Sequence, residues 1–350
     1  MKQELAFLKE LTDLRSTSGG EEAVRSFLKK EFLNLTNQVE TDGLGSLIAY
    51  EGKKGPKILA VGHMDEVGFI VRAITKDGYI KIARCGFFFE SGALSQHFII
   101  NTGKGDVEGI CSLGPGFISK EFPKIEDLVI DIGCESEEEA RELGVRIGDL
   151  IVPKGDFAAV GKQQKYLINK AWDNRIGCAV SLRTMENLKK SGHPNIFVGG
   201  GSVQEEVGTR GAVTMADKVG ADIAFSIDIG PADDTYQGNR EEGCLGKGPQ
   251  LTFMDSATIS NRKLLKFAAE VAEECGIPYQ TVVQKHGGTD ASEFQYANAG
   301  TPVLLLNIPC RYAHTPTSMI HYDDYVNAVK LLTEIVKRLD EEKVREIRSF

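Results

Sequence analysis

Apolar residues follow two different spacings along the chain. They recur at helical intervals in the first 14 residues and from Glu21 to Leu33, where Ser18–Glu21 resembles a capping box. Lys57–Val61 is a short apolar strand, and the alternation of helix and strand returns after Asp173. It predicts further strands at Ile196–Val203, Ile223–Ile229 and Val303–Ile308 and helices at Arg175–Lys190, Asn261–Cys275 and Tyr325–Ile347. This order predicts an α/β fold with a mainly parallel sheet covered by helices.

The pattern changes between residues 67 and 161, where short strand-like runs are separated by glycine-containing turns. One helical segment, Ser136–Glu142, interrupts these runs. Regular turn signals without long helices are typical of a small all-β unit. The sequence therefore predicts a main domain formed by residues 1–66 and 162–350, with a small β domain inserted at 67–161.

Composition narrows the class of partner. The 350 residues are 41% apolar, which is ample for a core, and the net charge is -9. Without a long basic run, nucleic acid and anionic membranes are poor candidate partners. No apolar stretch approaches the ~20 residues of a membrane span, and the N-terminus does not resemble a signal peptide. Seven cysteines without a Cys-x-x-Cys spacing argue against disulfides and thiolate zinc sites, so we expect a cytoplasmic protein.

Two adjacent glutamates, Glu205 and Glu206, follow the apolar run 195–204. Neighbouring carboxylates repel each other, and burying either one is costly unless it is paired or bound to a metal. Strand ends that lead into glycine-containing loops are where α/β enzymes place their chemistry. The pair makes physical sense if one glutamate holds a cation and the other moves a proton.

Histidine and carboxylate side chains also follow the other strand-like runs. His63 and Asp65 come after the first run, and the remaining candidates at such ends are Asp173, Asp228 and His314. Two imidazoles, several carboxylates and no thiolate suit zinc, cobalt or manganese. Two such ions could share one carboxylate and lower the pKa of bound water to near neutral.

Each candidate also has an ordinary structural explanation. Asp173 could cap a helix, Asp228 could belong to a turn, and the two glutamates could lie in a first helical turn. Together these explanations require five unrelated coincidences, because polar residues follow five separate strands at the same edge of the predicted sheet. The remaining histidines and acids are weaker: His97 and His193 are expected to be structural or exposed, His321 peripheral, and His286, Asp255 and Asp290 near the cleft without being ligands.

Other chemistries have less support. The sequence contains no dinucleotide-binding glycine fingerprint, no P-loop and no nucleophile elbow. Cys178 lies inside a helical pattern, which favours a buried structural thiol. A metal-dependent deacylase, a glycoside hydrolase with two carboxylates, and an inactive metal-dependent scaffold stay open as alternatives.

The motifs around these residues resemble those of the M42 family of metallo-aminopeptidases, the glutamyl aminopeptidase and TET peptidase group. The resemblance covers nearly the whole chain, in the family's order, at Gly62–Gly68, Ala171–Arg175, Val203–Gly208, Asp228–Gly230, Gly287–Asp290 and Arg311–His314. It implies a zinc-exopeptidase-like main domain and an inserted β domain that serves dimerisation and substrate access. It also implies peptide substrates and self-association, from dimers up to dodecamers. Some members of the family carry an endoglucanase label.

The resemblance also implies roles for the candidate residues. His63, Asp173 and Asp228 would hold one ion, and Asp173, Glu206 and His314 the other, with zinc or cobalt most expected. Glu205 would be the general base and acid, and Asp65 would orient His63. The peptide bond after Asp173 would be cis. The preferred N-terminal residue of the substrate does not follow from the sequence.

Overall fold

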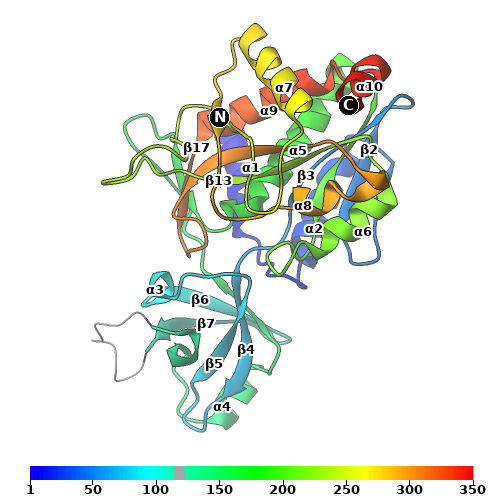
Figure 1. Cartoon of the computed structure of the whole chain (residues 1–350). Helices are drawn as coiled ribbons and strands as arrows, with labels where there is room; N and C mark the ends of the chain where they lie inside the picture. The colour runs from blue at the N-terminus through cyan, green and yellow to red at the C-terminus, as the bar shows by residue number, and fades with distance from the viewer. Residues whose placement is uncertain (114–122, 350) are drawn as a thin grey trace.

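The computed structural model describes residues 1–113 and 123–349, which form a large α/β unit and a smaller β-barrel (Figure 1). In that view the barrel lies below the large unit, and the two chain segments that enter and leave the barrel connect them. The described part of the chain contains no helix long and apolar enough to cross a membrane.

The large unit is built on an 11-stranded sheet whose four central strands are parallel. These central strands are, in spatial order, β12 (Ile196–Ser202), β3 (Lys57–His63), β13 (Ile223–Pro231) and β16 (Val303–Arg311). The outer strands are β1 (Val39–Thr41), β2 (Leu47–Glu51), β10 (Ala158–Val160), β11 (Tyr166–Asn169), β14 (Gln250–Thr252), β15 (Gln280–Val282) and β17 (Ser318–His321). Both flanks of the parallel centre join through antiparallel pairs. The prediction of a mainly parallel sheet therefore holds for the centre, whereas all outer pairs except β14 with β15 are antiparallel.

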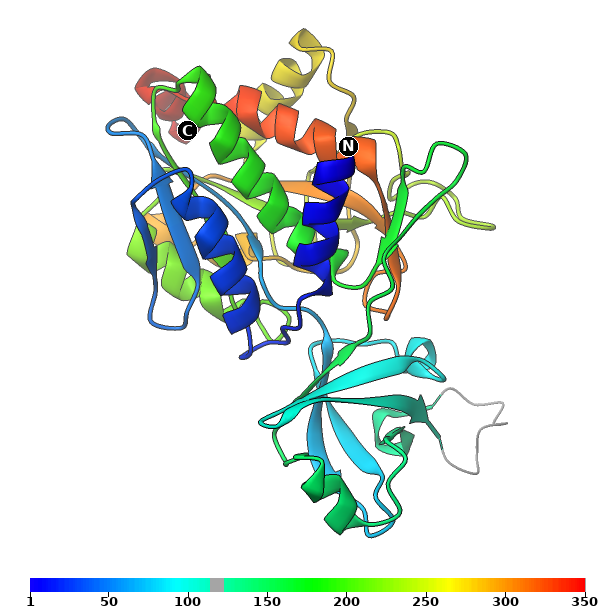
Figure 2. The ribbon, with the colours of Figure 1, turned by 180° about the vertical axis from the view of Figure 1, so that it is seen from behind.

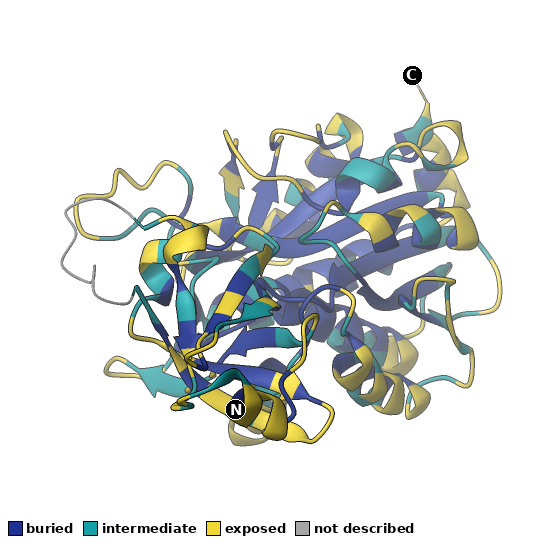
Figure 3. Cartoon of the chain, turned by 90° about the horizontal axis from the view of Figure 1, so that it is seen from below, coloured by how far each residue is buried: buried dark blue, intermediate teal, exposed yellow. Residues whose placement is uncertain are grey.

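Helices cover both faces of this sheet (Figure 2). One face carries α1 (Lys2–Asp13), α2 (Glu22–Leu33), α5 (Trp172–Ser191), α7 (Arg262–Glu274), α9 (Tyr322–Val336) and α10 (Glu341–Arg348), which share one apolar cluster. A second cluster joins α6 (Arg210–Val219) and α8 (Ala291–Phe294) to the sheet. Figure 3 shows the resulting distribution: the central strands are largely buried, and the outward turns of the helices are exposed.

The barrel closes in the order β4-β5-β8-β7-β6-β9. Its elements are β4 (Gly68–Ile74), β5 (Ile80–Cys85), α3 (Glu90–Ala93), β6 (His97–Thr102), β7 (Gly105–Ser112), β8 (Val129–Asp131), α4 (Glu137–Glu142) and β9 (Leu150–Pro153). It has an apolar cluster of its own, which includes Phe69, Phe88 and Phe98. β10 follows the barrel and pairs with β11 in the large sheet.

The C-terminal helix predicted at Tyr325–Ile347 is two helices, α9 and α10. Asp340 begins the second one, because its carboxylate accepts a hydrogen bond from the backbone N–H of Lys343 at 2.8 Å. The Asn195 side chain donates to the backbone carbonyls of Val336 and Leu339, at 2.7 and 2.8 Å, where α9 ends. A contact between distant segments therefore fixes a break that helical periodicity does not reveal.

A buried ion cluster ties the N-terminal segment to the edge of the sheet. Glu66, which is 2% exposed, accepts hydrogen bonds from Lys170 Nζ at 2.6 Å and Arg175 Nη2 at 3.0 Å. Arg175 also donates to the backbone carbonyls of Leu11 and Leu14, at 3.0 and 3.1 Å. Burial lowers the pKa of Lys170 to about 8, although Glu66 acts in the opposite direction. The carboxylate of Glu66 is thus the counter-charge for two buried cations.

We expect Glu66→Gln to lower the free energy of unfolding by about 3–5 kcal/mol, because the substitution leaves buried cations without their anion. Urea denaturation followed by fluorescence of the single tryptophan, Trp172, measures this change. The control is Glu137→Gln, which removes an ion pair to Arg141 in α4 that lies near the surface. That control should change the unfolding free energy by less than about 1 kcal/mol. Equal effects of the two substitutions would contradict the assignment.

Candidate functional site

The candidate residues lie at the carboxyl edge of the parallel strands. β3 ends at His63, which is paired in register with Ser202, the last residue of β12. Asp228 lies within β13, and His314 follows β16. α5 begins after β11 and carries Asp173 in its first turn. The shared direction of the central strands therefore brings residues more than a hundred positions apart to one edge.

Asp173 lies between the two histidines. Its Oδ1 is 3.0 Å from His63 Nε2, and its Oδ2 is 3.1 Å from His314 Nε2. The peptide bond from Asp173 to Asn174 is cis, as the family resemblance implies. Asn174 holds this turn, because its side chain donates to the Ile227 carbonyl at 2.8 Å and accepts from the N–H of Gly177 at 3.0 Å. Asp173 can thus contact both imidazoles with its two oxygens.

The two glutamates diverge toward different histidines. Glu205 Oε2 lies 3.7 Å from His63 Nε2, and Glu206 Oε2 lies 3.9 Å from His314 Nε2. Asp228 Oδ1 is 4.0 Å from the same nitrogen of His63. Ligand atoms of His63, Asp173 and Glu206 all lie within 4.8 Å of one another, close enough to surround one metal ion.

Asp65 contacts three parts of this centre. His63 Nδ1 is 3.1 Å from its backbone oxygen and 3.3 Å from Oδ1, an arrangement that keeps Nε2 turned toward Asp173. The backbone N–H groups of Glu205 and Glu206 donate to the two carboxylate oxygens of Asp65, at 3.1 and 3.2 Å. The sequence suggested only the first of these contacts. Asp65 therefore fixes the glutamate turn as well as the imidazole.

The cluster contains more carboxyl groups than imidazoles that could balance them. Burial raises the pKa of Glu205, Glu206 and Asp228 well above the usual range, and neighbouring carboxylates add to the effect. Burial disfavours the charged form of His63, yet Glu205 and the other carboxylates raise the pKa of this histidine well above its usual value. Burial also opposes ionisation of Asp173, but hydrogen bonds from His314 and His63 lower its pKa. Such like-charge groups in a buried site favour binding a cation.

The Ser18–Glu21 segment contributes to this site and is not a capping box. Glu21 is the N-cap of α2 but makes no side-chain cap bond. The Ser18 hydroxyl donates to Asp65 Oδ2 at 2.6 Å, and Glu21 Oε1 accepts from the backbone N–H of Gln204 at 3.0 Å and of Gly19 at 2.8 Å. Ser18 and Glu21 therefore bind Asp65 and Gln204, which lie far away in sequence, and neither side chain caps α2.

The acids and histidines that the sequence ranks as weaker candidates differ in whether they lie near the cluster. Asp290 is buried, accepts a hydrogen bond from Ser202, and has its pKa raised by burial to about 6. Asp255 instead closes a turn, accepting from the N–H groups of Ala257 and Thr258. The other histidines lie outside the cluster: His97 pairs with Glu108, His193 contacts Asn195, His286 is exposed, and His321 caps α9.

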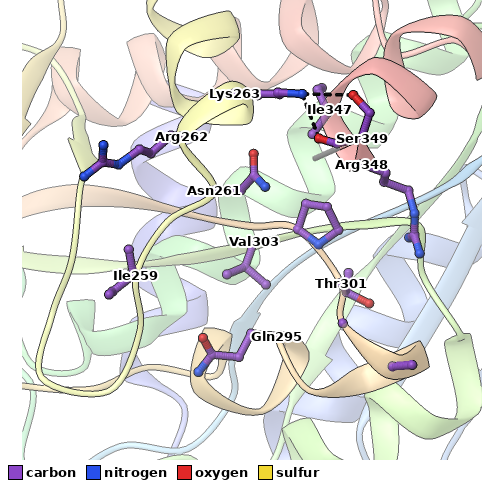
Figure 4. Close-up of a pocket in the computed structure, with 13 residues that line it drawn as sticks. Ile259, Asn261, Arg262, Lys263, Gln295, Thr301, Val303, Ile347, Arg348 and Ser349 are labelled. Carbon is purple, nitrogen blue, oxygen red and sulfur yellow. Dashed lines mark hydrogen bonds between the residues drawn. The ribbon is translucent and has the colours of Figure 1, made fainter.

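A hollow elsewhere in the molecule has a different character. It has a volume of about 620 Å³ and lies between the segment before α7, residues 295–303 and the C-terminal helix (Figure 4). Arg262, Lys263 and Arg348 give it basic side chains, and it contains none of the seven candidate residues. The convergence of carboxylates and imidazoles, and not the size of a cavity, therefore marks the site.

Comparison with known proteins assigns the family. A model of the family described as M42 glutamyl aminopeptidase matches residues 45–331. The chain belongs to the M42 aminopeptidase family. It is 34% identical to glutamyl aminopeptidase of Lactococcus lactis subsp. cremoris over 98% of each chain.

Solved structures agree with this assignment. The crystal structure of a TET aminopeptidase from a marine sediment archaeon, Thaumarchaeota archaeon, superposes with a TM-score of 0.95 at 36% identity and covers 99% of both chains. The TET1 peptidase of Pyrococcus horikoshii has a TM-score of 0.86 at 30% identity, covering 96% of this chain and 100% of that one. The protein is thus an M42 aminopeptidase, a peptide hydrolase that acts at the N-terminus of peptides.

We expect Ser18→Ala to lower kcat by about 10- to 100-fold, because a hydrogen bond to a buried charged group contributes about 1.5–3 kcal/mol. KM should change little, since the hydroxyl contacts Asp65 and not the substrate. Steady-state kinetics on a peptide measures kcat and KM, and elemental analysis measures how much metal the variant binds.

Two further variants separate positioning from general stability. Ser18→Thr keeps the hydroxyl and should recover most of kcat. Glu22→Gln is the control. The Glu22 side chain is 71% exposed, next to the buried Glu21, and its substitution should leave kcat near the wild-type value. A wild-type kcat in Ser18→Ala would show that the contact to Asp65 has no part in positioning.

Proposed function

We propose that the edge cluster binds two divalent metal ions, zinc or cobalt, in each subunit and that Glu205 is the general base and acid of peptide hydrolysis. His63, Asp173 and Asp228 would hold one ion. Asp173, Glu206 and His314 would hold the other, so that Asp173 bridges the pair. Imidazole nitrogens and carboxylate oxygens without thiolates are donors that suit these metals.

The state of the donor atoms supports this proposal. Glu206 Oε1 is buried without a hydrogen-bond partner, in a region where neighbouring carboxylates disfavour its charge. His63 Nδ1 contacts Asp65, so that Nε2 faces carboxylate oxygens of Asp173 and Glu205. Such contacts require either a shared proton or a cation. A pair of divalent ions would provide the missing positive charge.

Two bound ions would lower the pKa of the attacking water and polarise the scissile carbonyl. Glu205 accepts a proton from that water and returns it to the leaving amine. Glu206 would be held ionised by the bound metal and would not exchange protons. Asp65 keeps both backbone N–H groups of the glutamate turn in place, so Glu205 works from a fixed position.

Glu205→Gln should reduce kcat by at least about a thousandfold, since the amide can neither accept nor return the proton. Bound metal should stay near the wild-type amount, because Glu205 is not among the proposed ligands. Turnover of a peptide after reconstitution with zinc or cobalt, with elemental analysis of the same sample, tests both statements. A variant with near-wild-type turnover would overturn the role of Glu205.

Asp173→Asn is the matched comparison at the bridging position. It should lose metal together with activity, and added zinc or cobalt should not restore either one. A chelator should also abolish activity of the wild-type enzyme, which separates it from a glycosidase that uses carboxylates alone. If Asp173→Asn kept both ions, the proposed ligand sets would be wrong.

We also propose that the enzyme self-associates, from dimers up to dodecamers, and that it works in the cytoplasm. The Pyrococcus horikoshii TET1 peptidase can assemble into a tetrahedron or a large octahedral shell. In this chain, four exposed apolar side chains lie on two neighbouring segments around β14 and β15: Phe253, Met254, Ile259 and Val283. Exposed apolar groups occur at protein–protein contacts, so we propose that these four side chains form one. The seven cysteines are all free thiols, which fits a reducing compartment.

The double substitution Phe253→Glu and Ile259→Glu should shift the protein to smaller species in sedimentation velocity, because carboxylates in an apolar contact are costly to bury. Val213→Glu is the control. Val213 is 51% exposed on α6, outside this group of side chains, and its substitution should leave the mass distribution unchanged. An unaltered distribution in the double variant would exclude this surface as a contact.

A further inference from the structure

A loop of the barrel lies directly against the proposed metal centre. It connects β5 to α3 and spans residues 86–89. The backbone N–H of Phe89 donates to the carbonyl of His314 at 3.2 Å. A Cβ atom added to Gly86 would lie 3.0 Å from Glu206 Cβ. The barrel therefore supplies one wall of the site, although all the proposed ligands come from the large unit.

Three consecutive phenylalanines in this loop alternate between buried and exposed positions. Phe88 is fully buried in the barrel core, with its ring centroid 4.8 Å from that of Phe69. Phe87 and Phe89 are 50% and 48% exposed, and their rings meet edge to face at 5.0 Å. Successive side chains of extended backbone point to opposite sides. Phe88 thus anchors the loop in the core while its two neighbours face outward.

The exposed ring of Phe87 adjoins a proposed metal ligand. Its centroid is 5.9 Å from the His314 ring, and the Arg84 guanidinium carbon lies 5.6 Å from the same centroid. Arg84 is ion-paired with Glu90, so its charge is neutralised within the barrel. Phe87 is held by three side chains and still presents half of its surface beside the reacting groups.

We propose that Phe87 and Phe89 form an apolar wall that receives a substrate side chain next to the scissile bond, and that the enzyme prefers aromatic and large aliphatic side chains there over acidic ones. This inference rests on the proposed function. A peptide whose scissile carbonyl reaches the cluster brings the side chains of its first two residues within reach of His314, and hence of Phe87. Covering two exposed rings with an apolar side chain removes apolar surface from water, at about 25 cal/mol per Å². A carboxylate side chain would lose hydration against the same rings without a partner, since aromatic faces attract cations and not anions.

Two tripeptide panels test the wall in the metal-reconstituted full-length enzyme. One panel varies the first residue among Phe, Leu, Ala, Lys and Glu before a constant Ala-Ala. The other varies the second residue in the same way after a constant N-terminal Ala. In the wild-type enzyme we expect kcat/KM for Phe to exceed that for Glu by at least about tenfold in one panel, and the panel that responds identifies which residue contacts the wall.

The double variant Phe87→Ala with Phe89→Ala should reduce this preference about tenfold, while kcat/KM for the Ala-Ala-Ala peptide changes much less. Phe87→Leu keeps an apolar side chain and should retain most of the preference for Leu. Both substituted rings are half exposed, so neither change opens the barrel core, and bound metal should stay at the wild-type amount. An apolar preference that persists undiminished in the double variant, or its absence from both panels in the wild-type enzyme, would overturn the proposal.

Tyr79→Ala is the matched control. Tyr79 is 40% exposed in the turn between β4 and β5. Figure 1 shows this turn beside α4, at the end of the barrel away from the large unit. Its substitution should leave both panels unchanged. Failure of the proposed function gives a different result, in which the wild-type enzyme with added zinc or cobalt hydrolyses none of the peptides.

Discussion

The fold concentrates five carboxylates at one buried edge of a sheet. The groups around them reduce the energetic cost of this arrangement. Asp65, Asp173, Glu205, Glu206 and Asp228 would repel one another without compensation. The protein supplies two imidazoles, the hydroxyl of Ser18 and backbone N–H groups from the glutamate turn. These donors hold the geometry but do not neutralise the charge. The edge is therefore built at a cost in stability that a bound cation would offset.

Close backbone packing is what carries Asp173 into this cluster. A Cβ atom on Gly62 of β3 would lie 2.7 Å from the Gly177 backbone in α5, and a Cβ atom on Gly177 would lie 2.3 Å from the Ile227 carbonyl of β13. Two glycines thus let the helix approach both strands more closely than any side chain would allow. Because the first turn of α5 bears Asp173, this approach sets the distance from Asp173 to His63.

The sequence predicted those features that local pattern encodes. Apolar runs located the central strands, and polar residues at their ends located the cluster, since parallel strands share one carboxyl edge. It failed where a side chain acts over a long distance. Ser18 and Glu21 look like a local cap, yet their partners are Asp65 and Gln204, 47 and 183 positions away. The antiparallel outer strands were missed for a related reason: their order depends on pairing between distant segments, which apolar periodicity does not specify.

Adjacent glutamates can hold different roles only if the backbone between them is fixed. The Asp65 carboxylate accepts both of their N–H groups, and Glu21 holds Gln204 immediately before them in a left-handed conformation, with φ at 55°. From this fixed turn one side chain extends toward His63 and the other toward His314. A flexible turn would let either carboxylate approach either imidazole, and both would compete for one cation. The proposed division of labour between Glu205 and Glu206 would therefore be a property of the turn and of the Asp65 carboxylate that binds it, and not of the two side chains themselves.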